Sequence, residues 1–340
     1  MKLFYSKQKA GNFGDDLNAW LWARLAPDLL DSAPDVSFSG IGTVIGPRMT
    51  GPGPWIVFGS GVGYGPPPRG FGGEDWRVVC VRGPVTARVL RLKPELACTD
   101  PAILLSALPE FAPVADGERH GVVFVPHHSA LERGAWAAVC ERAGIEYLSP
   151  QTDSVEVVKR LRTARLVIAD AMHAAIIADA MRTPWIAVRT SREISTLKWC
   201  DWTLSMGLRY APVELPASTA REAVRSNALH LWGRDYACHD ASLGGLEWHF
   251  WRDAWRKTRW WWSLRRRLGK NLYKVIDAIE GRWRKGEDEG RLDAAAKVLA
   301  DLARRPGTLS DASVGARHTA RLLRELRALE AQYADVRARA

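Results

Sequence analysis

The chain has 340 residues, of which 47% are hydrophobic and 25% are charged, and its formal net charge is +10. This length allows two ordinary domains, and the composition is typical of a globular protein. The five cysteines are scattered without a C-x-x-C pair, and no window has the roughly 18–20 apolar residues of a spanning helix, which excludes a disulfide framework, a zinc ribbon and a transmembrane protein.

Residues 1–115 alternate short apolar runs with glycine turns, the pattern of an N-terminal Rossmann-like lobe. The expected strands are Leu3–Tyr5, Ser37–Ile45, Trp55–Val62 and Val78–Val81, and the expected helix runs from about Asp16 to Leu25. Glycines gather in two of these strands, at Gly40–Gly42 and Gly59–Gly63. No convincing helix follows either of them, so the dinucleotide-binding fingerprint is absent.

Two charged residues of this lobe stand where an apolar run gives way to a helix. Arg82 follows a buried strand and precedes Pro84, which suits the first position of a helix. Asp100 precedes Pro101 in the same way. Because ligand sites in open parallel sheets lie at the carboxyl ends of strands, both residues are site candidates.

Residues 116–235 repeat the alternation of strands and helices and predict a C-terminal Rossmann-like lobe. The expected strands are His120–Val125, Ile145–Leu148, Leu166–Ile168 and Trp185–Val188, and the expected helices are Leu131–Ala143, Val155–Arg162 and one from near His173 to Pro184. The fold class is therefore α/β, with two lobes that face a cleft.

His173 is the central candidate of the chain. It follows the strand Leu166–Ile168 and Asp170, at the start of a helix, where backbone N–H groups and the positive helix end converge. A histidine there can meet an anionic substrate and transfer a proton near neutral pH. The alternative is a histidine that only caps its own helix.

Residues 236–340 predict a helical, basic, tryptophan-rich tail. Residues 241–340 contain 22 Lys and Arg against 13 Asp and Glu, whereas residues 1–240 contain 26 against 25. A neutral body with a basic tail favours contact with an anionic surface, either a membrane or a nucleic acid. Nucleic acid fits poorly, because no recognised binding module accompanies the charge.

Four tryptophans mark one face of an expected helix in this tail: Trp248, Trp251, Trp255 and Trp262. A further amphipathic helix is expected over Ala316–Ala340. Tryptophans beside arginines suit an interfacial helix on an anionic membrane, whereas packing of the tail back onto the lobes would bury the same tryptophans.

Several motifs together resemble the polysaccharide pyruvyl transferase family, in particular bacterial exopolysaccharide ketal-pyruvate transferases. They are Asn12-Phe-Gly-Asp-Asp16, Arg82-Gly-Pro84, Asp100-Pro-Ala102 and the helix that begins His173-Ala-Ala-Ile-Ile177. The likeness covers about residues 1–215. It implies a fold similar to the two-lobed GT-B glycosyltransferases and transfer of pyruvate from phosphoenolpyruvate to two hydroxyls of one sugar. The acceptor implied is a lipid-linked repeat unit at the cytoplasmic face of the inner membrane, which makes the protein cytoplasmic and peripheral.

That chemistry needs a proton donor and acceptor as well as cations for a phosphate and a carboxylate. We assign His173 as the acid/base, and Asp100 either orients it or caps the following helix. Arg82 is a candidate to bind one anion, with a structural ion pair as the alternative. The candidates for the other anion are Lys198, Arg189 and Arg192, each of which can equally be a solvated loop charge.

The remaining candidates could contact the substrate or serve only the local fold. Asp15 and Asp16 could contact sugar hydroxyls or cap a helix, and Asn12 could touch ligand or hold its turn. His127, beside His128, could reach the cleft or only start a helix. No third ligand at metal spacing accompanies this pair, so we expect no metal and no cofactor, with phosphoenolpyruvate as a co-substrate.

Two other functions stay open at this stage. A GT-B-like glycosyltransferase would also need two lobes, a cleft and basic residues, but would use a nucleotide sugar. A non-enzymatic membrane scaffold is the second alternative. It is suggested by Ala171, which stands where many members of the family have an arginine.

Overall fold

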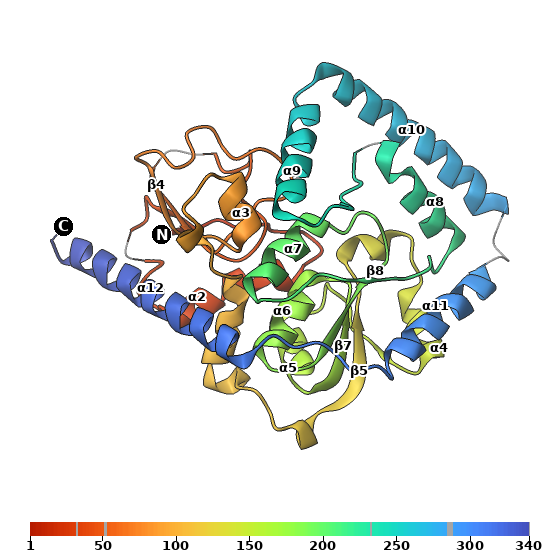
Figure 1. The fold of residues 1–340 in the computed structure, drawn as a ribbon, viewed down its shortest axis with the longest axis horizontal. Coiled ribbons are helices and arrows are strands. Elements are labelled where there is room, and N and C mark those ends of the chain that lie inside the picture. Colours follow the sequence, from red (N-terminus) through yellow and green to blue (C-terminus); the bar gives the residue numbers. More distant parts are fainter. Residues whose placement is uncertain (32, 51–52, 232, 284–287, 340) are drawn as a thin grey trace.

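A computed structural model describes residues 1–31, 33–50, 53–231, 233–283 and 288–339. It confirms a mixed α/β chain with two parallel sheets (Figure 1). The first sheet has the order β1-β2-β3-β4, formed by Lys2–Leu3, Ser37–Ser39, Trp55–Phe58 and Trp76–Cys80. All four residues of β3 are buried, as expected for a parallel strand covered on both faces.

The helical segments of this first half are short. They are α1 (Phe13–Asp16), η1 (Leu17–Ala19), α2 (Leu21–Leu25), α3 (Pro84–Val89), η2 (Pro94–Leu96), η3 (Pro101–Ala107), η4 (Pro109–Phe111) and η5 (Asp116–Glu118). The prediction of one helix from Asp16 to Leu25 is therefore wrong. The buried side chain of Asn18 bonds both the N–H and the C=O of Ile41, at 3.1 Å each, and the chain leaves helical geometry at Trp20.

The second sheet has the order β6-β5-β7-β8-β9. Its strands are β5 (His120–Val125), β6 (Glu146–Tyr147), β7 (Ala164–Ala169), β8 (Trp185–Arg189) and β9 (Val213–Glu214), all paired in parallel. The segments between them are η6 (His128–Glu132), α4 (Trp136–Ala143), α5 (Ser154–Arg162), α6 (Met172–Ala180) and α7 (Thr196–Ser205). The helix expected from Leu131 begins only at Trp136, because η6 and a turn at Arg133 come first.

One hydrophobic core connects the two sheets. Helix α6 is buried at every residue except His173, and it packs against both η3 and β7. The largest apolar cluster accordingly joins Phe38 and Val57 of the first sheet to Val123 and Val167 of the second. Since α6 packs on η3 of the first half and on β7 of the second sheet, the first residues of this helix are held at the junction between the two halves.

The C-terminal third packs around the outside of the sheets (Figure 1). It contains α8 (Ala220–Ala228), η7 (Leu229–Leu231), α9 (Leu243–Lys257), α10 (Trp260–Trp283), α11 (Asp288–Leu302) and α12 (Ala312–Arg339). Helix α9 contacts α3, α10 contacts α8, α11 contacts α4 and α12 contacts η3. The single helical face expected for the four tryptophans is wrong, because the chain breaks between Lys257 and Trp260 and puts Trp262 on another helix.

Trp248 is 62% exposed and Trp255 is 53% exposed, whereas Trp262 is only 8% exposed. Among the helices of the described ranges, none has the length and hydropathy required to cross a membrane.

Candidate active site

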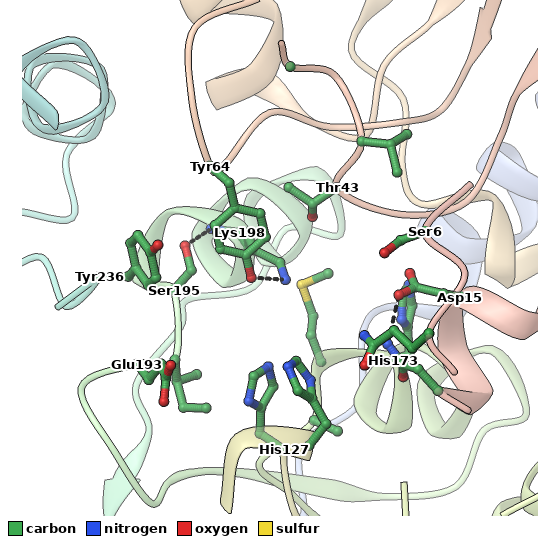
Figure 2. A pocket seen from close by; sticks show the side chains of 18 of the residues that line it. Ser6, Asp15, Thr43, Tyr64, His127, His173, Glu193, Ser195, Lys198 and Tyr236 are labelled. Carbon is green, nitrogen blue, oxygen red and sulfur yellow. Dashed lines mark hydrogen bonds between the residues drawn. The ribbon is translucent and has the colours of Figure 1, made fainter. Parts of the chain in front are cut away.

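A cavity of about 510 Å³ opens where the carboxyl ends of both sheets meet. Its walls come from the segments that follow β1, β2 and β3 in one sheet and β5, β7 and β8 in the other. Strand ends of parallel sheets gather loops and helix starts at one edge, which is why sites form there. Figure 2 shows side chains from these segments pointing into the common space.

His173 occupies the second position of α6 and lines this cavity, with 12% of its side chain exposed. Its Nε2 lies 3.7 Å from Oδ2 of Asp100, which is too long for a hydrogen bond. Neither of these two buried atoms has a hydrogen-bond partner within the described residues. The imidazole of His173 faces the carboxylate of Asp100, and a small shift of the ring would bring the two within hydrogen-bond distance.

Asp100 is completely buried and performs two tasks at once. Its Oδ1 accepts a hydrogen bond of 3.1 Å from the N–H of Ala102 and so caps η3, while its Oδ2 faces the imidazole. The helix-capping and the histidine-orienting interpretations are therefore compatible, because they use different oxygens.

Gly14 of α1 packs directly on the imidazole. A Cβ built on Gly14 would stand 2.0 Å from Nδ1 and 2.4 Å from Cγ of His173, far inside van der Waals contact. Only glycine lets α1 approach this closely. The ring is thus held between α1 of the first half and the buried Asp100.

Asp15 follows Gly14 and also faces the cavity, next to His173 (Figure 2). Its Oδ2 accepts a 2.7 Å hydrogen bond from Nδ2 of Asn12. Burial raises the pKa of the Asp15 carboxyl, and the nearby charges of His173 and Lys198 oppose that rise. Asp16 does not line the cavity; it accepts a hydrogen bond from the N–H of Asn12 and stabilises its own turn.

Cationic side chains line the other side of the cavity. Lys198 of α7 donates a 2.9 Å hydrogen bond from Nζ to the hydroxyl of Tyr64 (Figure 2). Arg234 forms an ion pair of 2.9 Å with Glu193, and the exposed Arg48 forms none within the part of the chain that is described. Lys198 and Arg48 can therefore offer their donors to an anion in the cavity.

His127 and His128 form the floor, with ring centroids 4.0 Å apart. Burial lowers the pKa of His127 well below its usual range, and lowers that of His128 to about 4, with Lys198 and Arg234 adding to the effect. Both rings are consequently neutral at pH 7. His127 also starts η6, where its Nδ1 lies 2.7 Å from the hydroxyl of Ser129.

Asp170, buried at the end of β7, fixes three strand ends together. Its carboxylate accepts hydrogen bonds from the N–H of His127 at 2.8 Å, and from the N–H and hydroxyl of Thr190 at 3.0 and 2.7 Å. Burial raises its pKa to about 6. The carboxylate orients the segments after β5 and β8, and in this way positions the histidine pair.

The comparisons with known proteins agree with this geometry. The family model for polysaccharide pyruvyl transferase matches residues 54–192, which include β3 to β8 and His173. The succinoglycan biosynthesis protein ExoV of Rhizobium meliloti is 39% identical over 240 residues, covering 69% of this chain and 74% of that protein. This chain belongs to the polysaccharide pyruvyl transferase family. No solved structure matches it.

Family membership makes the protein an enzyme, a polysaccharide pyruvyl transferase, as the motifs indicated. A glycosyltransferase or a membrane scaffold is therefore not needed to explain the cavity. Ala171 lines the cavity of this pyruvyl transferase, and Arg48 and Lys198 line it too. Within the described residues, no group of three or more His, Cys, Asp or Glu side chains is placed to hold a metal ion.

Arg82 of the pyruvyl transferase does not line the cavity, so the expected anion contact finds no support in the geometry. The side chain is completely buried, with Nε 2.9 Å from Oδ2 of Asp201. Its other nitrogens donate to the hydroxyl of Thr43 at 2.6 Å and to the C=O of Val62 at 3.1 Å. The structural ion-pair interpretation fits, because Asp201 belongs to α7 and the pair joins it to the first sheet.

Arg189 and Arg192 also lie outside the cavity. Arg189 pairs with Glu214 of β9 at 2.6 Å, and Arg192 pairs with Asp235 at 2.9 Å. Both arginines are therefore neutralised by neighbours. Of the three cations expected near the second anion, the structure brings only Lys198 to the cavity.

Most residues that line the cavity were not predicted from the sequence; among them are two arginines and two tyrosines, Arg48, Tyr64, Arg234 and Tyr236. Tyr64 directly follows the glycine run Gly59–Gly63, which gave a signal for close approach of the chain to a ligand. Arg234 and Tyr236 are distant in sequence from every strand end, and no local pattern marks them.

Proposed function

We propose that this pyruvyl transferase moves pyruvate from phosphoenolpyruvate onto a sugar of a lipid-linked exopolysaccharide repeat unit, as a cyclic ketal. The name of the Rhizobium meliloti relative, a succinoglycan biosynthesis protein, supports an exopolysaccharide acceptor. The two parallel sheets that meet at one cavity support a GT-B-like pair of lobes, over residues 1–115 and 116–235, with the tail over residues 236–340.

The reaction balances without a redox cofactor. A proton adds to C3 of phosphoenolpyruvate, so that C2 becomes an electrophilic, oxocarbenium-like carbon. Two hydroxyls of the sugar bond to C2 and release two protons, and the C2–O bond to phosphate breaks. One of these protons replaces the proton used at C3, and the other leaves on inorganic phosphate.

His173 is the acid/base in this proposal, and the observation that carries the assignment is its place in the cavity with Asp100 behind it. A protonated imidazole can deliver a proton to C3, and the neutral ring can accept one from a hydroxyl. Asp100, which does not line the cavity, would act as a positioning residue that stabilises the imidazolium. Asp15, which lines the same cavity and has a raised pKa, would hold a sugar hydroxyl or share the proton.

Lys198 and Arg48 are the groups that would hold the carboxylate and the phosphate. Charge-assisted hydrogen bonds of this kind are each worth about 1.5–3 kcal/mol and gain strength where water is excluded. The neutral His127 and His128 add no positive charge but can donate or accept one hydrogen bond each. Asn12, bonded to Asp15, would keep that carboxylate in place.

The experiment is release of inorganic phosphate from phosphoenolpyruvate in the presence of an acceptor glycan. We expect His173→Ala to lose at least about 100-fold in kcat, the lower limit of a general acid/base contribution. The matched control is His230→Ala, at an exposed histidine outside the cavity. Normal turnover by His173→Ala would contradict the proposal. It would also be contradicted if nucleotide diphosphates raised the thermal stability of the protein and phosphoenolpyruvate did not.

We also propose that the enzyme works as a peripheral protein at the cytoplasmic face of the membrane, through its tail. The support is an apolar stripe on α10, formed by Trp260, Leu264, Leu268, Leu272 and Val275, which are each at least 51% exposed. Spacings of four, four, four and three residues put them on one side of the helix. Basic residues beside the stripe suit anionic headgroups.

Sedimentation with phospholipid vesicles tests this docking. We expect binding to vesicles that contain phosphatidylglycerol, and loss of that binding in Leu268→Asp/Leu272→Asp. The control is Leu243→Asp, an exposed leucine on α9 outside the stripe. Equal binding by the stripe variant and the control would refute docking through α10.

A further inference from the structure

A second cavity, of about 1160 Å³, lies between α8, α10 and the loop around Tyr64. Its α10 wall carries four cations, Arg266, Arg267, Lys270 and Lys274. Among the described residues, Glu132 is the only carboxylate of the lining. The space is therefore strongly positive.

The four α10 cations form no ion pair within the described part of the chain. Other basic residues of the same lining are neutralised: Arg225 pairs with Glu193 at 2.9 Å, and Lys257 pairs with Asp253 at 2.6 Å. Like charges that face one cavity repel each other, which costs stability unless an anion binds among them. The arrangement is that of an anion site.

The two cavities adjoin each other. Tyr64, Arg234 and Tyr236 line both of them. The rings of Tyr64 and Tyr236 meet edge to face, with centroids 5.3 Å apart (Figure 2), and Lys198 on the catalytic side bonds to Tyr64. A ligand that is bound beside Lys198 can therefore extend past the tyrosine pair toward the α10 cations.

Helix α10 is fixed against its neighbours at three points. A Cβ on Gly269 would stand 2.8 Å from the C=O of Leu231, and a Cβ on Gly233 would stand 2.2 Å from the ring of Trp262. Tyr273 is buried with Ala228 of α8. The cationic wall is thus a built part of the fold, and the adjoining face of α10 carries the exposed apolar stripe.

The catalytic cavity, the cationic cavity and the apolar stripe lie in the same order as the sugar, the phosphate ester and the lipid of a lipid-linked saccharide. The catalytic cavity would hold the sugar, the cationic cavity comes next, and Leu264 belongs both to that cavity and to the apolar stripe. We propose that the cationic cavity binds the phosphate or diphosphate ester that joins the acceptor saccharide to its lipid. The proposal rests on the function proposed above and names the contact that this function needs.

Phosphate chemistry fits this cavity better than a carboxylate of an acidic sugar does. A diphosphate carries more than one negative charge on adjacent groups, whereas each carboxylate carries one. Two arginine forks and two ammonium groups on successive turns of α10 can surround such a group, since Arg binds phosphate oxygens in pairs and Lys supplies a point charge.

The test is calorimetric titration of inorganic pyrophosphate into the full chain, with phosphoenolpyruvate present at saturation so that the catalytic cavity is occupied. Salt is kept near physiological, where exposed charges beyond about 8 Å are screened. We expect Arg266→Gln/Lys270→Gln to weaken pyrophosphate binding at least tenfold. Arg324→Gln/Arg327→Gln removes the same charge from α12 and should leave binding unchanged.

Activity supplies the second readout. With an acceptor that bears a diphosphate ester, Arg266→Gln/Lys270→Gln should raise the acceptor KM at least tenfold and leave the KM for phosphoenolpyruvate unchanged. Pyrophosphate bound equally by both double variants would overturn the inference, as would tighter binding of a uronic-acid oligosaccharide than of pyrophosphate. Pyrophosphate binding without any turnover of phosphoenolpyruvate would instead overturn the proposed function and leave the anion site standing.

Discussion

Gly14→Ala is the sharpest test of how the imidazole of His173 is held. The new methyl group would lie 2.0 Å from Nδ1, 2.4 Å from Cγ and 2.6 Å from Cβ of the histidine. Carbon atoms in contact need about 3.5–4.0 Å, so α1 and the ring must separate by roughly 1 Å or more. Because Cβ of His173 is among the clashing atoms, rotation of the ring alone does not relieve the contact.

Two effects with known sizes follow. Overpacking costs about 1–3 kcal/mol of the free energy of unfolding, although alanine in a helix would otherwise gain up to about 1 kcal/mol over glycine. A displacement of about 1 Å at a catalytic group can cost about 100-fold in rate. We therefore expect Gly14→Ala to fold with reduced stability and to lose about 100-fold in kcat for phosphate release.

A double-mutant cycle separates this clash from any other effect on α1. His173→Gly removes all three atoms that the methyl group would meet, so the stability cost of Gly14→Ala should vanish in that background. Gly244→Ala on α9, where a Cβ meets nothing within 4 Å, is the control and should not lose stability. An undiminished cost of Gly14→Ala in the His173→Gly background would refute the reasoning, and so would full activity of Gly14→Ala alone.

Three further outcomes are expected. Arg82→Leu leaves the buried carboxylate of Asp201 without its ion-pair partner, so the free energy of unfolding measured in urea should fall by about 3–5 kcal/mol. A fall below about 1 kcal/mol would contradict the buried ion pair. His128 is held neutral with a folded pKa of about 4, so its unfolded form binds the extra proton between pH 6.5 and 4. The free energy of unfolding of the wild type should therefore fall between pH 7 and pH 4, and that of His128→Asn should fall by up to about 3 kcal/mol less. Parallel profiles of unfolding free energy against pH for the two proteins would contradict this. Lys198→Gln should raise the KM for phosphoenolpyruvate about 10–100-fold. Tyr64→Phe, which removes only one hydrogen bond, should raise this KM about fivefold. A larger increase in Tyr64→Phe than in Lys198→Gln would rule out Lys198 as the anion contact.

The sequence predicted the second half of the fold better than the first. The strands around His173 are apolar runs separated by helices whose apolar residues recur at helical spacing, and these signals are local. The first half depends on long-range contacts instead. Asn18 leaves its expected helix because Ile41, in another segment, offers both of its backbone groups. A tertiary hydrogen bond of this kind overrides helical periodicity, and the spacing of apolar residues in the sequence does not reveal it.

The same limit explains which of the predicted residues line the cavity. His173, Asp15 and His127 directly follow strands or begin helices, so their place at the strand ends could be predicted. The role of Arg82 could not, because it is decided by Asp201, which is 119 residues away in the sequence. Arg234 lines the cavity together with Tyr236, whose backbone bonds the backbone of Arg192 and of Thr196 in the segment after β8, about 40 residues earlier in the chain.

The tail gives the clearest argument that charge alone does not define a function. Its net positive charge predicted an anionic partner without saying where, and the structure separates the charge into distinct surroundings. Cations on α9 rest on tryptophan rings, as Arg252 does on Trp248 at 4.4 Å, whereas those on the inner face of α10 point into a cavity without an ion-pair partner among the described residues. Because that cavity shares Tyr64, Arg234 and Tyr236 with the one that holds His173, this charge is part of the path of a substrate in our proposal. The apolar stripe beside it indicates from which side the substrate would arrive.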